Sequence, residues 1–368
     1  MKRYSFLAGL VVIALATSIT VAASGNPIVG AVYTMSNAPG GNQMLLFDRH
    51  ADGTLTPGGV VATGGTGTGG GLGNQGAVVL NEDCEWLLAV NAGSNSVSIF
   101  EVKEHGLRLT DVAPSGGIRP VSIAVDHDLV YVLNAGSDAI TGFRITRRGR
   151  LLALPGSTRA LSGAGTGPAE VAFSPNGRIL VVTEKATNLI DVFKVSPDGM
   201  VGSGESHPSN GATPFGFAFG RRGELLVSEA FGGAPNASAV SAYRTRRDGS
   251  FDLIDGTVAT NQTAACWVLV TRGGSLAYVT NTGSGTISGY AIDHDGTLTL
   301  LNADGVTGDT QPGSGPIDLA SSDDGRFLYS LNAGAHSVGA FRIEPDGQLT
   351  ALPFAGGLPA GANGLAAR

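Results

Sequence analysis

The chain has 368 residues, of which 14% are charged, 42% are hydrophobic and 57 are glycine. So few charges and so much glycine exclude a mainly helical protein and favour an all-β chain with many tight turns, because glycine supplies the positive φ that such turns require. The hydrophobic content is large enough for an ordered core. A formal net charge of −7 disfavours a nucleic-acid partner, since phosphate binding needs a basic face.

The first 23 residues are predicted to be a secretory signal peptide. Lys2 and Arg3 give a positive start, residues 6–16 form an apolar run, and residues 21–23 are small enough for cleavage. The alternative is a membrane anchor, but the apolar run is short for a bilayer span of about 20 residues. We therefore expect an exported protein, periplasmic or extracellular, with no membrane span after cleavage.

One pattern recurs through residues 24–368. It consists of a strand that ends in Asn or Glu, a turn of small residues, a second strand, and a turn rich in Asp and Gly. The residue that closes the first of these strands recurs on average about every 49 residues, at Asn37, Asn91, Asn134, Glu184, Glu229, Asn281 and Asn332. Seven such units fill the chain after the signal peptide. The prediction is a single all-β domain, a seven-bladed β-propeller of four-stranded antiparallel blades.

Turn residues and the C-terminal tail complete this architecture. The hairpin between the third and fourth strands of a unit is Asp-Gly at 52–53, 198–199, 248–249, 295–296 and 346–347, with His105-Gly106 and Arg148-Gly149 in the same place elsewhere. No inner strand precedes residue 29, whereas the tail 359–368 resembles the inner-strand motif of residues 167–178. We therefore expect the C-terminal strand to be the inner strand of the N-terminal blade and so to close the ring.

The meander places certain polar residues at one mouth of the central channel. The inner strand of a blade runs down the channel and the second strand runs up, so the start of one and the end of the other share a face. Glu170 and Glu184 of the fourth unit meet this condition. Alignment of the units adds further candidates at the same mouth: Arg119, Asn134, Glu229, Trp267 and Asp318.

These residue types suit a ligand site, although a simpler interpretation exists. A carboxylate crowded by other carboxylates can act as a general base, and an Arg can bind a carboxylate or phosphate through two hydrogen bonds. The alternative is that they are solvated polar groups, and that Asn residues such as Asn134 form turns. Glu184 and Glu229 stand out because the other five units have Asn at this position.

Other sequence features give weaker signals. The glycine-rich segment 64–76 lacks the Lys and the helix of a phosphate-binding loop, so it is either a lid over the channel or a passive linker. The six His residues show no metal-ligand spacing, and no metal or other cofactor is expected. Cys84 and Cys266 lie four units apart, so we expect two unpaired thiols.

The repeat resembles a known class of propeller. The letters YVTN stand at residues 278–281, and residues 167–184 are most similar to the blade motif of the β-propeller lactonase family, which includes bacterial 6-phosphogluconolactonase and fungal carboxymuconate cyclase. The resemblance covers nearly all of residues 28–368 and implies a metal-independent site that opens or closes a lactone at the channel mouth. Glu184 matches the family Glu of this blade, whereas Ala169 and Glu170 stand where the family usually has Arg-His.

Together these observations predict a monomeric, lactonase-like hydrolase that acts on a small lactone or related cyclic ester. Glu184 would be the general base that activates water, Glu170 an assisting acid or base, and Arg119 an anion clamp. The substrate would be contacted by Asp318, Trp267, Glu229 and Asn134. The alternative is a non-catalytic propeller that binds a protein or a cell-envelope component, which a filled channel and a large exposed apolar patch would favour.

Overall fold

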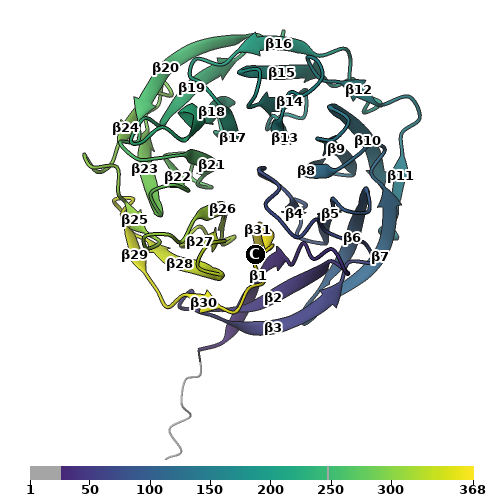
Figure 1. The fold of residues 1–368 in the computed structure, drawn as a ribbon, viewed down its shortest axis with the longest axis horizontal. Helices are drawn as coiled ribbons and strands as arrows, with labels where there is room; N and C mark the ends of the chain where they lie inside the picture. The colour runs from purple at the N-terminus through teal and green to yellow at the C-terminus, as the bar shows by residue number, and fades with distance from the viewer. Residues whose placement is uncertain (1–25, 247) are drawn as a thin grey trace, which may run out of the picture.

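The chain forms seven antiparallel sheets arranged as blades around one axis (Figure 1). The structure is a computed structural model that describes residues 26–246 and 248–368. The predicted signal peptide therefore lies outside the described residues. The seven-bladed all-β prediction is confirmed, and the described residues contain one three-residue 3-10 helix, Phe231–Gly233. No helix in the described part of the chain combines the length and apolarity needed to cross a bilayer.

The first four blades, numbered from the N-terminus, have the following strands. Blade 1 contains β1 (Ile28–Met35), β2 (Gln43–His50), β3 (Leu55–Ala62) and the C-terminal β31 (Asn363–Ala367). Blade 2 contains β4 (Val78–Leu80), β5 (Trp86–Asn91), β6 (Ser96–Lys103) and β7 (Gly106–Pro114). Blade 3 contains β8 (Pro120–Asp126), β9 (Leu129–Asn134), β10 (Ala139–Ile145), β11 (Leu151–Ala153) and β12 (Arg159–Ala160). Blade 4 contains β13 (Pro168–Phe173), β14 (Ile179–Glu184), β15 (Leu189–Lys194) and β16 (Glu205–Pro208).

The remaining three blades repeat the plan. Blade 5 contains β17 (Pro214–Phe219), β18 (Glu224–Glu229), β19 (Ala239–Thr245) and β20 (Phe251–Ala259). Blade 6 contains β21 (Ala265–Val270), β22 (Leu276–Asn281), β23 (Thr286–Ile292), β24 (Leu298–Leu300) and β25 (Gly308–Asp309). Blade 7 contains β26 (Pro316–Ser321), β27 (Phe327–Asn332), β28 (Ser337–Ile343), β29 (Leu349–Ala351) and β30 (Ala355–Gly356). In blades 3, 6 and 7 the outer strand is split into two short pieces that both pair with the third strand.

The repeat residues have the structural positions that the sequence predicts in six of the seven blades. Asn or Glu is the last residue of β5, β9, β14, β18, β22 and β27. Asn37 is the exception, because β1 ends at Met35 and Asn37 lies in the following turn with a φ of 49°. The glycines of the hairpins between third and fourth strands all have positive φ, from 67° at Gly149 to 104° at Gly106. Glycine adopts this conformation without strain, which explains the recurring Asp-Gly pairs.

The two ends of the chain meet in blade 1. The C-terminal β31 pairs antiparallel with β1, with Val32 opposite Ala367 and Met35 opposite Asn363, and it is the innermost strand of that sheet. The main-chain N–H of Leu365 also donates to Asp318 Oδ2 in blade 7, at 3.0 Å. The closing strand is therefore bonded both to β1 of its own blade and to the inner strand of blade 7.

Buried tyrosines join neighbouring blades away from the channel. The hydroxyls of Tyr131, Tyr278 and Tyr329 donate to the carbonyls of glycines in the next blade's hairpin, at 2.9, 2.9 and 3.1 Å. All three rings have no more than 1% exposure. A buried hydroxyl is costly without a partner, so these bonds fix how each blade packs on the next. Both cysteines are unpaired, as the unit spacing predicts.

Candidate functional site

Blade 4 ends its second strand in a fully buried carboxylate. The run Ile179–Glu184 is rich in β-branched residues, and all six of its side chains are buried between the neighbouring blades. Asn188, in the turn that follows, has a φ of 56°, which Asn tolerates better than most residues. The turn places Glu184 directly opposite Leu189 in β15.

Glu184 is surrounded by hydrogen-bond donors. Its Oε1 accepts the main-chain N–H of Ser162 at 3.0 Å, and its Oε2 accepts the hydroxyls of Ser162 and Thr187, each at 2.5 Å. Glu184 is 0% exposed, whereas Ser162 and Thr187 are exposed. The general-base role that the sequence predicts for Glu184 stays a prediction, and in the structure these two hydroxyls join the buried carboxylate to the surface.

Asp191 is a second carboxyl group in this cluster, and the sequence analysis did not identify it. It is 1% exposed, is hydrogen-bonded to Glu184, and its Oδ2 accepts the N–H of Ser162 at 3.0 Å. Burial, together with the hydrogen bond and the charge of Glu184, raises the pKa of Asp191. The raised pKa favours the protonated form of Asp191 beside Glu184.

The repeat itself contained a signal for Asp191. Seven residues after Asn91 and Asn281 come Ser98 and Ser288, and each of these hydroxyls accepts a hydrogen bond from the Asn side chain, at 2.7 and 2.9 Å. Asp191 stands seven residues after Glu184, at the corresponding position. A carboxyl in place of a serine was therefore a second departure from the repeat in the same blade.

Glu229 holds the equivalent place in blade 5 but has different partners. Its Oε1 accepts the N–H of Gly211 and the hydroxyl of Ser241, each at 2.7 Å. It is 0% exposed, and burial raises its pKa above the usual range. Its Oε2 has no hydrogen-bond partner among the described residues. A substrate has no direct access to this carboxyl, so its predicted role as a substrate contact stays a prediction.

The inner strands carry side chains that bond the backbone of the next blade. Ser122 Oγ accepts the N–H of Val171 at 3.1 Å, and Glu170 Oε2 accepts the N–H of Phe217 at 2.6 Å. Asp318 bonds Leu365 in the same way. Glu170 and Asp318 are 6% and 4% exposed, so their observed partners are structural and their predicted roles at the substrate stay predictions.

Burial controls the ionisation of these two inner carboxyls. It raises the pKa of Glu170 well above its usual range, and the nearby Asp318 adds to the shift. Burial also raises the pKa of Asp318 to about 8, although two main-chain N–H groups oppose the change. Burial therefore favours the protonated form of both of these inner carboxyls.

In blade 5 the corresponding inner-strand position is Gly216, and a residue from another part of the chain takes over its role. Gln75, in the glycine-rich segment 64–76, accepts the N–H of Val268 at 3.0 Å and donates to the carbonyl of Val268 at 2.8 Å. A Cβ on Gly216 would collide with Gln75 Oε1 and would lie 2.6 Å from the carbonyl oxygen of Cys266. The missing side chain is therefore what allows Gln75 to enter.

The segment 64–76 is neither a lid nor a passive linker, because it runs into the channel (Figure 1). The N–H of Gln75 donates to Ala169 O at 3.0 Å, and the carbonyl of Gly76 accepts the N–H of Ile123 at 2.9 Å. The indole N–H of Trp267 donates to the carbonyl of Asn74. These bonds connect the segment with blades 3, 4 and 6. Trp267 is 4% exposed, so it serves as an anchor for the segment.

A cationic residue, Lys185, follows Glu184 directly in the chain. Lys185 donates to the carbonyls of Gly73 and Pro168, at 2.6 and 3.1 Å, and its ammonium lies 4.7 Å from the centre of the Phe215 ring. Burial lowers the pKa of Lys185 to about 8, and the positive charge of Arg119 adds to the effect. Sequence analysis missed Lys185.

The last two predicted residues differ in accessibility. Arg119 is exposed, and its guanidinium has no hydrogen-bond partner among the described residues, which suits an anion clamp. Asn134 is fully buried, and its side-chain amide donates to the carbonyl of Ser115 at 3.2 Å. This contact fits the turn-forming interpretation of Asn134.

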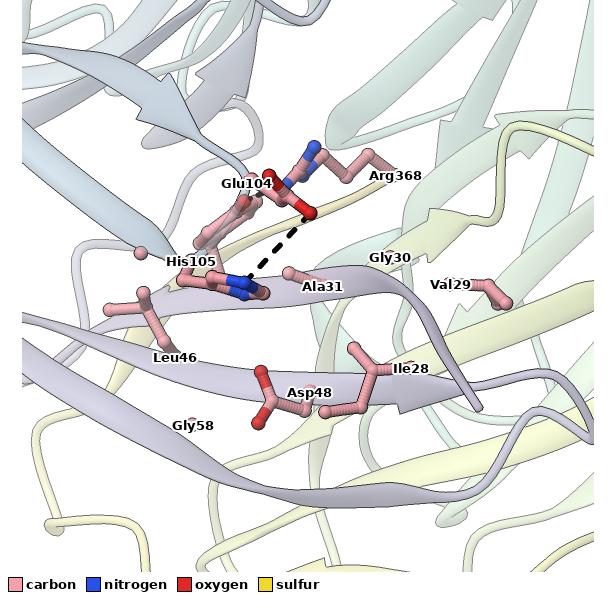
Figure 2. A pocket seen from close by; sticks show the side chains of 12 residues that line it. Ile28, Val29, Gly30, Ala31, Leu46, Asp48, Gly58, Glu104, His105 and Arg368 are labelled. Atoms are coloured by element: carbon pink, nitrogen blue, oxygen red, sulfur yellow. Dashed lines mark hydrogen bonds and ion pairs between the residues drawn. The ribbon is translucent and has the colours of Figure 1, made fainter. Parts of the chain in front are cut away.

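Several cavities lie at the opposite face of the ring. Figure 2 shows one of about 360 Å³ between blades 1 and 2, lined by the start of β1, Asp48, the Glu104–His105 turn and Arg368. Glu104 and His105 form an ion pair of 3.9 Å there, with both side chains almost fully exposed. An exposed ion pair of this kind contributes little free energy to stability.

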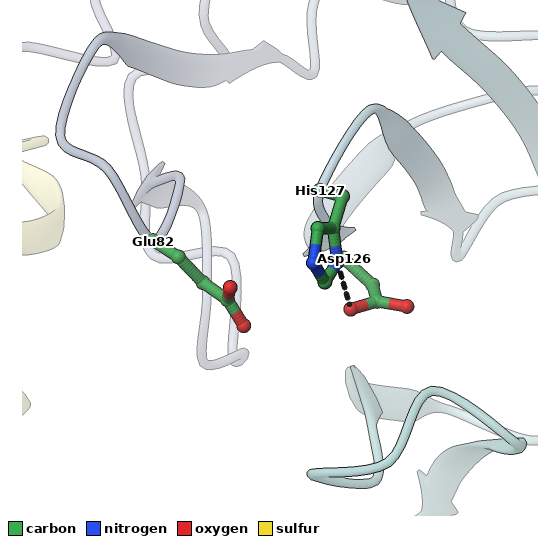
Figure 3. A group of neighbouring side chains, drawn as sticks. All are labelled: Glu82, Asp126 and His127. Atoms are coloured by element: carbon green, nitrogen blue, oxygen red, sulfur yellow. Dashed lines mark hydrogen bonds and ion pairs between the residues drawn. The ribbon is translucent and has the colours of Figure 1, made fainter.

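A possible group of metal-ligand residues lies at this opposite face (Figure 3). Glu82, Asp126 and His127 place three ligand-type atoms within 4.8 Å of one another. The His127 ring bonds Asp126 at 3.0 Å, and that bond and the negative charge of Asp126 raise the pKa of His127. The sequence gave no sign of this group because Glu82 comes from a different blade.

Comparison with known proteins places the fold in a family. The family model described as lactonase, 7-bladed beta-propeller matches residues 41–164 and 153–231, which together span slightly more than half of the chain. The chain belongs to this lactonase family. The 6-phosphogluconolactonase of Yersinia pestis is 30% identical over 120 residues, which are 32% of this chain and 36% of the relative. The match thus covers little more than a third of the length of that curated relative.

Two solved structures share the whole architecture. A protein from Lactobacillus plantarum is 17% identical with a TM-score of 0.74, over 92% of this chain and 100% of that chain. The periplasmic gluconolactonase of Pseudomonas aeruginosa is 16% identical with a TM-score of 0.70, over 91% of this chain and 98% of that chain. At such identities the likeness concerns the fold.

Proposed function

We propose that this lactonase-family chain is an exported hydrolase that opens small lactones or related cyclic esters at the channel-mouth face of blade 4. The observation that carries the proposal is the buried pair of Glu184 and Asp191 behind two exposed hydroxyls. Ester hydrolysis needs a base that takes a proton from the attacking oxygen. Glu184 accepts hydrogen bonds from hydroxyl groups that solvent and substrate can reach.

Nearby positive charge supports the same chemistry. Hydrolysis of a lactone produces a carboxylate, and the transition state develops negative charge on the carbonyl oxygen. The guanidinium of Arg119 is exposed and unpaired among the described residues, and it is close enough to Lys185 to lower the pKa of that amine. An anionic group on the substrate or product is thus favoured at this face.

The first 23 residues support export, since their charge and apolar pattern is that of a secretory signal. Among the structural neighbours is a periplasmic gluconolactonase, which is consistent with such a location. N-terminal sequencing of the protein secreted by an expressing cell tests this part. A mature N-terminus near residue 24 in the exported fraction is the expected result, and retention of the intact chain inside the cell would contradict it.

Hydrolysis of a panel of five- and six-membered lactones by the purified protein tests the activity. The wild type should release acid from at least one lactone, and Glu184→Gln should lower kcat/KM at least about 100-fold, because general-base catalysis contributes about that much or more. Glu205→Gln in the outer strand of the same blade is the control, since Glu205 is exposed and Lys194 is its one ion-pair partner among the described residues. Equal inactivity of the wild type and Glu184→Gln on every lactone would refute the assignment.

Two observations favour a second function, a non-catalytic propeller that binds a partner. The glycine-rich segment enters the channel, and Glu170, Glu229 and Asp318 are buried with structural partners. Under this alternative the carboxyls would only hold the blades together. Glu184→Gln would then lower the melting temperature, and the wild type would hydrolyse none of the lactones.

A further inference from the structure

Ser162 is the exposed residue whose hydroxyl contacts the buried carboxyls of blade 4, Glu184 and Asp191, from the connecting segment before β13. It lies in the segment that passes from blade 3 to the inner strand of blade 4, and it is exposed. Its Oγ donates to Glu184 Oε2 at 2.5 Å. In blade 5 the residue whose N–H bonds Glu229 is Gly211, which has no side chain that could react.

The backbone holds Ser162 in this position. Its N–H lies 3.0 Å from both Glu184 Oε1 and Asp191 Oδ2, so the two carboxyls fix the main chain as well as the hydroxyl. Asp191 is held in turn by the hydroxyl of Ser206, which donates to its Oδ1 at 2.6 Å. The Ser162 hydroxyl thus contacts a base, Glu184, which in turn contacts a group that orients it, Asp191. This is the arrangement that activates a serine.

The surroundings of Ser162 leave room for a carbonyl group. The next residue is Gly163, and an added Cβ there would meet no atom within 4 Å. The main-chain N–H groups of Gly163 and Ala164 have no acceptor within the described part of the chain. Unpaired N–H groups beside a nucleophile can stabilise the oxyanion of a tetrahedral intermediate.

We propose that Ser162 is the nucleophile of the lactone hydrolysis and forms a covalent acyl-enzyme, an inference that rests on the proposed function. Ser162 Oγ attacks the lactone carbonyl and its proton moves to Glu184. The ring C–O bond then breaks, and the departing alkoxide takes that proton, which leaves a hydroxyacyl ester on Ser162. Water attacks this ester while Glu184 accepts its proton, the hydroxy acid leaves, and Oγ recovers a proton.

Ser162 fits this role better than Thr187, the other exposed hydroxyl on Glu184 Oε2. The Ser162 hydroxyl is primary, whereas the Thr187 hydroxyl is on a branched carbon and is more hindered. The main chain of Ser162 is also bonded to both carboxyls, whereas Thr187 contacts only Glu184 among the hydrogen bonds of the described residues.

Labelling with an alkyl fluorophosphonate tests the proposal without requiring any lactone. The fluorophosphonate phosphorylates an activated serine with loss of fluoride, and intact-mass measurement with peptide mapping locates the adduct. We expect one adduct per wild-type chain, on Ser162, and none after heat unfolding. No adduct on the folded wild type, or an adduct on Thr187 instead, would overturn the proposal, and neither result depends on a variant that folds.

Variants then separate this proposal from the proposed function. Ser162→Ala should lose the adduct and at least about 100-fold in kcat/KM, while Ser196→Ala, at an exposed serine in the outer hairpin of the same blade, should keep both. Lactone hydrolysis that persists at more than a third of the wild-type rate in a folded Ser162→Ala would refute the nucleophile and leave the lactonase standing. Labelling of Ser162 without hydrolysis of any lactone would support the activated serine and refute the lactonase.

Discussion

Blades 4 and 5 share one backbone plan but use their buried glutamates differently. Glu184 is bonded to a second carboxyl, Asp191, and to two exposed hydroxyls. Glu229 is bonded to the hydroxyl of Ser241 and to a main-chain N–H. A buried carboxyl that ends the second strand is therefore a structural element of both blades. In blade 4 the hydroxyls on this carboxyl belong to the exposed residues Ser162 and Thr187, whereas in blade 5 the connecting segment offers the N–H of Gly211 and, at 3.5 Å, the hydroxyl of the half-buried Ser209.

The same two blades also differ at the inner strand. Blade 4 bonds the next blade through Glu170, whereas blade 5 has Gly216 and relies on Gln75 from the glycine-rich segment. One connection is a buried carboxyl that titrates, and the other is a neutral amide from a distant part of the chain. The segment 64–76 therefore gives blade 6 the side-chain contact that an inner-strand residue of blade 5 would otherwise make.

The largest expected effect follows from closing the space at Gly216. Gly216→Ala should lower the free energy of unfolding by about 1–3 kcal/mol, because the new Cβ collides with Gln75 and with the Cys266 carbonyl, and buried overpacking has that cost. Denaturant unfolding monitored by fluorescence measures the change. Gly70→Ala in the same segment is the matched control, since no atom lies within 4 Å of its added Cβ, and its effect should stay within about 0.5 kcal/mol. Equal stability of the two variants would show that Gln75 does not support the ring.

A smaller effect should distinguish the contact made by Glu170 from the contact made by Gln75, namely how the free energy of unfolding changes with pH. The pKa of Glu170 is raised in the folded protein above its ordinary 4.5, so the folded state holds a proton that the unfolded state has lost. The contribution of Glu170 to the free energy of unfolding is therefore complete below the unfolded pKa. It declines as pH rises above about 4.5, by at most about 1.4 kcal/mol per pH unit. Glu170→Gln should therefore flatten the decline seen in the wild type, although Asp318 with its pKa of about 8 retains a part of it.

Gln75→Ala supplies the contrast for that measurement, because an amide does not titrate. It should lower the free energy of unfolding by a similar amount at every pH and leave the slope unchanged. A slope that is the same in Glu170→Gln and wild type between pH 5 and 8 would show that Glu170 is ionised in the folded protein, contrary to the cause assigned here.

The architecture could be predicted well from the sequence because the same sequence pattern recurs in each blade of a propeller. Seven anchor residues and seven hairpins set the count of blades, and one Asp-Gly turn resembles the next. The site was harder to predict, because its contacts join segments that no repeat places together. Ser162 lies in a connecting segment without a repeat pattern, and Gln75 reaches a blade 193 residues away. Alignment of the repeat units also does not show which side chains are buried. Glu170, Glu229 and Asp318 were therefore predicted at an open mouth, although all three are buried.

The central claim is that Glu184 acts through the hydroxyl of Ser162, and a double-mutant cycle on lactone kcat/KM tests it most directly. Groups that act as a unit give strongly non-additive losses. Ser162→Ala, Glu184→Gln and the double variant should therefore all lose a similar factor, about 100-fold or more. A double variant whose loss equals the product of the two single losses would contradict the claim, because it would mean that the hydroxyl and the carboxylate contribute independently.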